Sequence, residues 1–185
     1  MSSRIRPLAT VLSTAAVLLI TVLVAWGCTL LPAPDSERPA GAPEVTRAEV
    51  TRHTDGDTAR FRLEGGAEEK VRFIGIDTPE VGESAEPYGE EAAAYTADAI
   101  PVGTTVWLET DAELRDRHGR LLAYVWLAEP QSGDGAEVRE LMLNARIVLD
   151  GFANAYTYPP NVKYTDTLKD LQSEARRAGR GLWAE

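Results

Sequence analysis

The chain of 185 residues contains a single cysteine, Cys28, so no disulfide can form within it and packing alone must hold its core. It is also poor in positive charge, because 19 Lys and Arg stand against 29 Asp and Glu, for a formal net charge of −10. This balance argues against non-specific nucleic-acid binding, which normally relies on a broad basic field. Any nucleic-acid function must therefore rest on a local site.

The remaining composition is that of an ordinary globular protein, with 44% hydrophobic and 26% charged residues and no visible internal repeat. The length suits one domain together with a tail or an anchor. Long hydrophobic runs are absent except for one, which lies near the N-terminus. The sequence therefore predicts one folded domain that follows an N-terminal targeting segment.

Residues 1–28 begin with Arg4 and Arg6 and continue as an apolar run from Leu8 to Trp26. A basic start before a run of about 19 apolar residues is typical of a secretory signal or an N-terminal membrane anchor. The run ends in Ala25-Trp-Gly-Cys28, which resembles a bacterial lipoprotein signal. Lipidation of Cys28, an uncleaved anchor and ordinary secretion all stay open. In each case we expect an exported protein, attached to the membrane or secreted.

Residues 29–44 carry four prolines with Asp, Ser, Glu and Gly between them. Such a composition cannot build a core and predicts an extended tether. The folded domain is expected over residues 45–185. From residue 29 onward, 17 Lys and Arg stand against 29 Asp and Glu, so this part has a charge of 17 − 29 = −12.

Five segments have the composition of β-strands, with β-branched and aromatic residues bounded by turn signals. The first three follow one another closely and predict a meander. The segments are Val45–Arg52, Thr58–Leu63, Lys70–Ile76, Thr104–Thr110 and Leu121–Leu127.

Three segments have helical signals. Tyr88–Ile100 lies between two prolines, Asn144–Asp150 starts with a residue suited to capping, and residues 164–175 carry an amphipathic stripe. Residues 137–143 are ambiguous. A helix after the third strand and two at the end predict an α+β fold dominated by β, a five-stranded OB-fold Greek-key barrel with three flanking helices.

Four carboxylates stand at the ends of neighbouring predicted strands. Asp55 and Asp57 flank a turn at Gly56, where we expect a positive φ, and Asp77 and Glu80 follow the third strand. If the second and third strands are adjacent, these side chains could converge. Oxygen ligands without His or Cys favour calcium or magnesium over zinc. The alternative is an ordinary turn and an ordinary strand exit.

Two arginines accompany the carboxylates. Arg72 lies inside an apolar run, where it needs a partner, which could be a carboxylate or a phosphate. Arg120 follows a charged turn and could be a surface residue or a second phosphate ligand. Two arginines beside a carboxylate-bound cation are suited to attack on a phosphodiester.

These residues resemble the staphylococcal nuclease (thermonuclease) family. The resemblance runs in order from about Val45 to Trp183, with the spacing inside each block preserved. The blocks are Asp55–Thr58, Arg72 with Gly75–Glu80, Tyr88–Ala92, Asp116–Arg120, Gly151–Ala153 and Gly181–Trp183.

The resemblance implies a calcium-dependent nuclease on an OB barrel that cuts DNA and RNA. It implies Ca²⁺ ligands in the carboxylates of Asp57 and Asp77 and the backbone carbonyl of Thr78, with Asp55 close behind them. Glu80 would be the general base or would orient the attacking water. The resemblance further gives Arg72 and Arg120 the role of stabilising the charge that develops on the phosphate.

The substrate pocket implied by the resemblance includes Tyr156 and Tyr158, with Tyr156 against the nucleotide. The chain departs from the pattern of this family at two places. His118, beside Arg117, replaces a tyrosine, which affects base stacking, and residues 81–87 form a short acidic loop in place of a lysine-rich one. Both changes bear on substrate affinity.

Three functions remain in competition. The first is a Ca²⁺-dependent nuclease, a monomer that acts on DNA or RNA and is tethered to a membrane. The second is an OB module that binds nucleic acid or another ligand without cleaving it, which the net charge favours. The third is a structural surface lipoprotein, for which calcium would have no specific effect on melting.

Overall fold

The computed structural model describes residue 39 and residues 41–184. The predicted targeting segment 1–28, with Cys28, and most of the predicted tether lie outside the described residues. Within the described part, no helix is long and apolar enough to span a bilayer.

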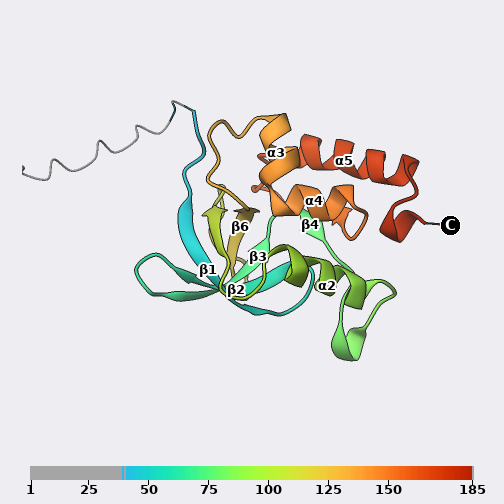
Figure 1. The fold of residues 1–185 in the computed structure, drawn as a ribbon, viewed down its shortest axis with the longest axis horizontal. Coiled ribbons are helices and arrows are strands. Elements are labelled where there is room, and N and C mark those ends of the chain that lie inside the picture. Colours follow the sequence, from blue (N-terminus) through green and yellow to red (C-terminus); the bar gives the residue numbers. More distant parts are fainter. Residues whose placement is uncertain (1–38, 40, 185) are drawn as a thin grey trace, which may run out of the picture. The chain divides into compact units, whose positions relative to one another are not determined.

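Five strands close into a barrel in the order β1-β2-β3-β6-β5 (Figure 1). Strands β3 and β6 run parallel and the other neighbours antiparallel. The predicted five-stranded barrel and its initial meander are therefore confirmed. The strands are β1 Thr46–His53, β2 Thr58–Leu63, β3 Glu68–Phe73, β5 Thr105–Glu109 and β6 Leu121–Trp126.

Alternation along the strands fills the barrel. Because successive side chains of a strand point to opposite faces, one set of apolar residues turns inward from each strand. Val50, Phe61, Val71 and Val106 are fully buried, while the charged residues between them on β1 and β2 face solvent. The outer face of the meander is thus free to carry polar side chains.

The third strand ends earlier than predicted. Gly75 has a φ of 80°, a left-handed conformation that glycine adopts at little cost. A Cβ at this position would also lie 2.5 Å from a methyl group of Leu168. The chain therefore turns, and residues Ile76–Asp77 form a separate short strand, β4, which pairs with β7, Asn154–Ala155. This turn directs Asp77 back toward Arg72.

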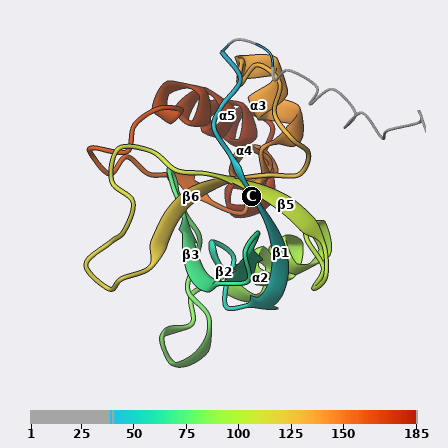
Figure 2. The same ribbon diagram turned by 90° about the vertical axis from the view of Figure 1, so that its left-hand side faces the viewer.

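Four α-helices are described: α2 Gly89–Ala99, α3 Gly135–Leu141, α4 Leu143–Leu149 and α5 Thr165–Arg177. The three predicted helices are confirmed, and the ambiguous segment supplies the fourth, α3. Helices α3, α4 and α5 lie together on one side of the barrel (Figures 1 and 2). Helix α2 contacts the C-terminal end of α4, where the Tyr95 hydroxyl donates to Asp150 Oδ2 at 2.6 Å. Two short 3₁₀ helices, Gly82–Ser84 and Gly181–Trp183, complete the set.

The predicted capping role of Asn144 is wrong. Asn144 is the second residue of α4, and its side chain is fully buried. Its Oδ1 accepts a hydrogen bond from the Val125 N–H at 2.9 Å. Its Nδ2 donates to the carbonyl of Ile74 at 2.8 Å. A buried amide needs such partners, and here they come from β6 and from the chain just before Gly75. Asn144 therefore fixes the turn that positions Asp77.

Candidate active site

Arg72 links two carboxylates, one from the turn just before β2 and one from β4. Its Nη1 lies 2.8 Å from Asp57 Oδ2, and its Nη2 lies 2.8 Å from Asp77 Oδ1. Nη1 also donates to the carbonyl of Ile76 at 3.0 Å. The pairing of Thr58 with Arg72 across β2 and β3 brings these groups together. Two of the four predicted carboxylates thus converge on the predicted arginine.

The carboxylate of Asp57 is positioned by hydrogen bonds from Thr78, the residue that follows Asp77. Its Oδ2 accepts hydrogen bonds from the backbone N–H of Thr78 at 2.9 Å and from the Thr78 hydroxyl at 3.1 Å. Gly56 permits this contact, because a Cβ there would lie 2.8 Å from the Thr78 methyl group. Gly56 is not among the glycines with positive φ, so the predicted reason for this glycine was wrong. Close approach, rather than backbone conformation, requires it.

Negative charge is crowded at this end of the barrel. Burial and the neighbouring charge of Asp57 raise the pKa of Asp55 to about 6, although Asp55 also accepts a hydrogen bond from the Asp57 N–H. Burial likewise raises the pKa of Asp77, with Asp57 and Glu86 adding to the rise and Arg72 opposing it. A group of carboxylates that resist ionisation together favours a bound cation.

The donors at this position fit a hard cation. Asp57, Asp77 and the carbonyl of Thr78 offer oxygen only, and Arg72 shows that positive charge is accommodated between the two carboxylates. Among the described residues, however, no three His, Cys, Asp or Glu side chains are grouped as they would be in a centre built from side chains alone. A cation here would complete its coordination with backbone oxygen, water or substrate.

Glu80 lies apart from the pair of aspartates. Its residue is exposed, and its carboxylate makes no ion pair or hydrogen bond with the described residues. Its backbone is fixed instead, because the Glu80 N–H donates to Glu86 Oε2 at 3.1 Å and the Glu80 carbonyl accepts from the Glu86 N–H at 2.9 Å. A Cβ on Gly89 would lie 2.2 Å from the Glu80 carbonyl oxygen, so α2 packs directly against this backbone. The Glu80 side chain is left free to respond to a ligand.

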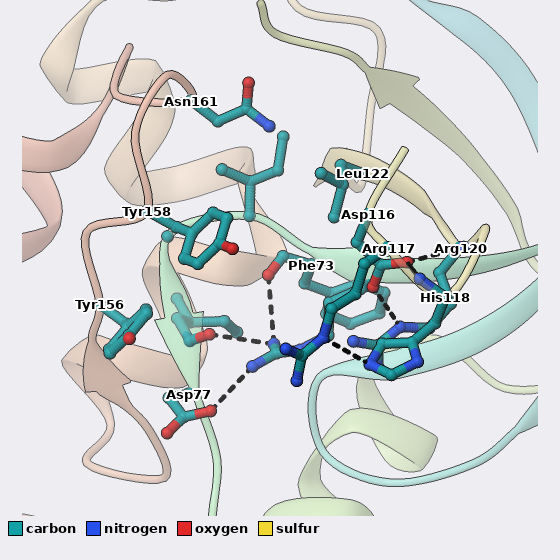
Figure 3. A pocket seen from close by; sticks show the side chains of 14 residues that line it. Phe73, Asp77, Asp116, Arg117, His118, Arg120, Leu122, Tyr156, Tyr158 and Asn161 are labelled. Atoms are coloured by element: carbon teal, nitrogen blue, oxygen red, sulfur yellow. Dashed lines mark hydrogen bonds and ion pairs between the residues drawn. The ribbon is translucent and has the colours of Figure 1, made fainter. Parts of the chain in front are cut away.

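A pocket of about 390 Å³ opens beside Arg72. Asp77, Tyr156 and Tyr158 lie along one side of it, and Arg117, His118 and Arg120 along the other (Figure 3). The two tyrosine rings are stacked, with centroids 6.5 Å apart, and both are more than half exposed. Exposed stacked rings beside arginines offer surfaces for a base and a phosphate.

The loop from Asp116 to Arg120 forms the other wall. Arg120 Nε donates to Asp116 Oδ2 at 2.7 Å, which holds its guanidinium at the pocket. Burial tends to raise the pKa of Asp116, but hydrogen bonds from Arg120 and from the His118 backbone bring it below its usual value. Arg117 Nε donates to His118 Nε2 at 3.1 Å. The two side chains therefore act as a unit.

The structure thus brings most of the predicted site residues together. Seven line the pocket: Arg72, Asp77, Arg117, His118, Arg120, Tyr156 and Tyr158. Asp55, Asp57 and Thr78 adjoin them through the contacts described above, Glu80 stands outside, and Cys28 is not among the described residues. Sequence reasoning missed Glu86 and Asn161, whose positions depend on loop closure. Asn161 lines the pocket and bonds both backbone groups of Glu113, at 2.7 and 2.9 Å.

Comparison with known families decides the family to which this chain belongs. The profile of the family described as staphylococcal nuclease homologue matches residues 70–185 of the chain, more than half of its length. The chain belongs to the staphylococcal nuclease family. This confirms the resemblance seen in the sequence, and it accounts for the closed barrel of five strands with flanking helices.

Individual members of the staphylococcal nuclease family align over most of the chain. The thermonuclease of Staphylococcus intermedius is 36% identical over 137 residues, which cover 72% of this chain and 74% of the relative. The thermonuclease of Staphylococcus hyicus is 34% identical over 138 residues, 73% of this chain and 74% of the relative. Endonuclease YncB of Bacillus subtilis (strain 168) is 32% identical over 161 residues, 81% of this chain and 70% of the relative.

Proposed function

We propose that this protein is a Ca²⁺-dependent nuclease that hydrolyses phosphodiester bonds in DNA or RNA as a monomer. The names of its relatives, thermonuclease and endonuclease, support the reaction class. One observation carries the proposal for this chain. Arg72 bridges Asp57 and Asp77 at the edge of a pocket that also holds Arg120 and two exposed tyrosines. Carboxylates, arginines and aromatic rings at one place suit a phosphodiester better than they suit a neutral ligand.

Asp57, Asp77 and the Thr78 carbonyl would hold the calcium ion. When bound, the ion supplies positive charge beside a phosphate oxygen and lowers the barrier to attack. Arg72 would turn from its carboxylate partners toward the phosphate and bind it with its two-pronged guanidinium. Arg120, held by Asp116, would meet the same phosphate from the opposite wall. Together the two arginines would stabilise the extra negative charge that builds up during attack.

Glu80 would accept the proton of the attacking water, or orient that water. Its exposed carboxylate has no partner among the described residues, and its backbone is fixed by Glu86 and by the close packing of Gly89. A base that is fixed at its backbone and free at its side chain can reach water beside a bound phosphate. Tyr156 and Tyr158 would stack with the base next to that phosphate, while Arg117 and His118 would contact the adjoining backbone.

A second candidate function is binding without cleavage. The charge of −12 over residues 29–185 and the acidic residues Glu83 and Glu86 in loop 81–87 favour it, because both weaken attraction for a phosphate backbone. Cleavage is the better proposal, because a simple binder has no use for paired aspartates that share an arginine.

The test compares cleavage of single-stranded DNA, duplex DNA and RNA with Ca²⁺, with Mg²⁺ and with a chelator. We expect cleavage with Ca²⁺ that Glu80→Gln lowers at least tenfold. Glu83→Gln is the matched control, because Glu83 lies in the same loop and is exposed. If no substrate is cut while Ca²⁺ raises the melting temperature, the calcium site exists but the nuclease function is wrong. The binding function then replaces it. If Ca²⁺ affects neither cleavage nor melting, the proposed calcium site and the Ca²⁺-dependent nuclease function are both wrong.

We further propose that the protein works outside the cytoplasm, attached through residues 1–28. The basic start, the apolar run and Cys28 support this proposal. Mass spectrometry of the membrane-extracted protein distinguishes the alternatives. A chain that begins at an acylated Cys28 supports the lipoprotein, an intact chain supports an anchor, and a shorter unmodified chain in the medium supports secretion.

A further inference from the structure

Three cations lie in one row across the outer face of the barrel. Arg52 on β1 is opposite Arg60 on β2, and Arg60 is opposite Lys70 on β3. The three strands are neighbours in the barrel (Figure 2). Opposed residues have Cβ atoms about 5 Å apart, so the three side chains adjoin one another. We call this set, Arg52, Arg60 and Lys70, the cationic row.

An irregularity in β1 brings Arg52 into the row. The register of β1 against β2 shifts between Val50 and Arg52, so Thr51 is an extra residue. Val50 is opposite Phe61 in the core, and without the extra residue Thr51 would face Arg60. A β-bulge changes which side chains point outward beyond it. Here it places a third cation on the outer face.

The cationic row lacks the acidic partners that the next row has. One step along the strands, Arg62 lies between Glu49 and Glu68 and pairs with both, at 3.3 and 3.9 Å. The side chains of Arg52, Arg60 and Lys70 make no ion pair or hydrogen bond with any described residue, and Arg52 and Arg60 are exposed. Like charges directly opposite each other destabilise a sheet. In a chain with 29 acidic residues, an uncompensated row of this kind suits an external polyanion.

The cationic row adjoins the candidate active site. Lys70 and Arg72 are two residues apart on β3, so both side chains leave the same face of the strand about 7 Å apart. The row therefore continues the positive charge of Arg72 across β2 to β1. An anionic lipid surface would meet the same charges, but it would not account for a row that leads to a pocket with phosphate ligands.

We propose that the cationic row binds the phosphate backbone of the polynucleotide beyond the phosphate held at Arg72. This rests on the proposed nuclease function and extends it to the course of the substrate. The contacts are with phosphates alone, so the row would bind any base sequence. It would also provide locally the attraction that the acidic chain lacks as a whole.

The test uses the full chain with Arg52→Gln, Arg60→Gln and Lys70→Gln combined, and Arg62→Gln as the matched control. In chelator, the affinity for single-stranded DNA is measured against salt concentration. Each phosphate contact contributes about 0.7 to the slope of log affinity against log salt, so the triple variant should lower the slope by about 2. With Ca²⁺, KM for a long strand should rise about tenfold while kcat stays the same, and a dinucleotide should be cut as before.

The melting temperature of the triple variant should equal or exceed that of the wild type, because like-charge repulsion is relieved. An unchanged salt slope and KM, or equal effects from Arg62→Gln, would show that the row does not bind the substrate. Loss of binding to phosphatidylserine vesicles with an unchanged nucleic-acid slope would assign the row to a lipid surface and overturn the proposal. If the wild type cuts no substrate, the nuclease function fails, while the salt slope in chelator still tests the row.

Discussion

Two clusters of carboxylate and cation in this molecule differ in how completely their charges are matched. Glu109 is only 2% exposed and accepts hydrogen bonds from Trp126 Nε1 at 2.8 Å, from the Tyr164 hydroxyl and from Lys163 Nζ. Its donors belong to β6 and to the residues just before α5, so one carboxylate joins three parts of the fold. Burial and the charge of Glu109 raise the pKa of Tyr164, which keeps its hydroxyl a donor.

The cluster around Arg72 is the reverse case. Two aspartates share one guanidinium, a third lies behind them, and the side chain of Asp77 is 54% exposed. The negative charge of this cluster is therefore not fully matched. Burial and mutual repulsion raise the pKa of Asp55 and of Asp77 as a result. A matched carboxylate therefore stabilises the fold, whereas crowded carboxylates that solvent can reach form a binding site. The predictions below test this contrast.

The largest effect is expected for Arg72→Ala. Removing a group that stabilises charge in the transition state should lower kcat about 10²–10³-fold. The measurement is Ca²⁺-dependent cleavage of an oligonucleotide. Arg139→Ala is the control, because Arg139 forms a similar two-pronged pair with Glu174, at 2.8 Å for each bond, and does not line the pocket. If Arg72→Ala keeps more than a tenth of the wild-type activity, Arg72 does not take part in the reaction.

Glu109→Ala should act on stability instead. It leaves the Trp126 N–H, the Tyr164 hydroxyl and Lys163 without their acceptor, and we expect a loss of about 2–3 kcal/mol in the free energy of unfolding. Urea denaturation measures this loss, with the exposed Glu140→Ala as the control. The kcat of the folded protein should change less than twofold. A large fall in kcat without a change in stability would reverse the roles that we assign to the two clusters.

Asp55→Asn should have a smaller effect, which concerns the melting temperature. The variant should be more stable than the wild type in chelator, but Ca²⁺ should stabilise it less. Removing one crowded charge, while keeping an oxygen that can accept from the Asp57 N–H, should raise the melting temperature in chelator by about 2–4 °C, as expected for roughly 1 kcal/mol. The rise that Ca²⁺ itself produces should become smaller, because less negative charge attracts the ion. Thermal melts with and without Ca²⁺ measure both. A fall in chelator would mean that Asp55 is needed for the turn rather than for the site.

The smallest effect concerns pH. Burial lowers the pKa of His53 from its ordinary value of 6.5, with a backbone group of Ile100 opposing the shift. The unfolded chain then binds a proton more readily, so the stability that neutral His53 provides is present above pH 6.5 and lost as pH falls below it. His53→Asn should flatten the curve of stability against pH below about 6.5. An unchanged curve would assign this acid loss to other groups.

The extent to which sequence could predict this protein follows from how local each feature is. β-Branched and aromatic residues bounded by turn signals predicted the five strands, because both signals are contained in short stretches of the chain. The spacing of Asp57, Arg72, Asp77 and Arg120 could be matched to a family, because the motifs are short and keep their order. The cap at Asn144 and the positive φ at Gly56 were wrong, because each residue is determined by contacts with distant parts of the chain.

The amino-acid sequence was sufficient to predict the family, the barrel and the set of residues from which a site could be built. How these residues meet became known from the fold alone. One guanidinium lies between two aspartates, Glu80 has a fixed backbone and a free side chain, and an extra residue in β1 brings Arg52 beside Arg60. The physical reason is that hydrogen bonding, close packing and strand register act between residues far apart in the chain, and no local pattern records them.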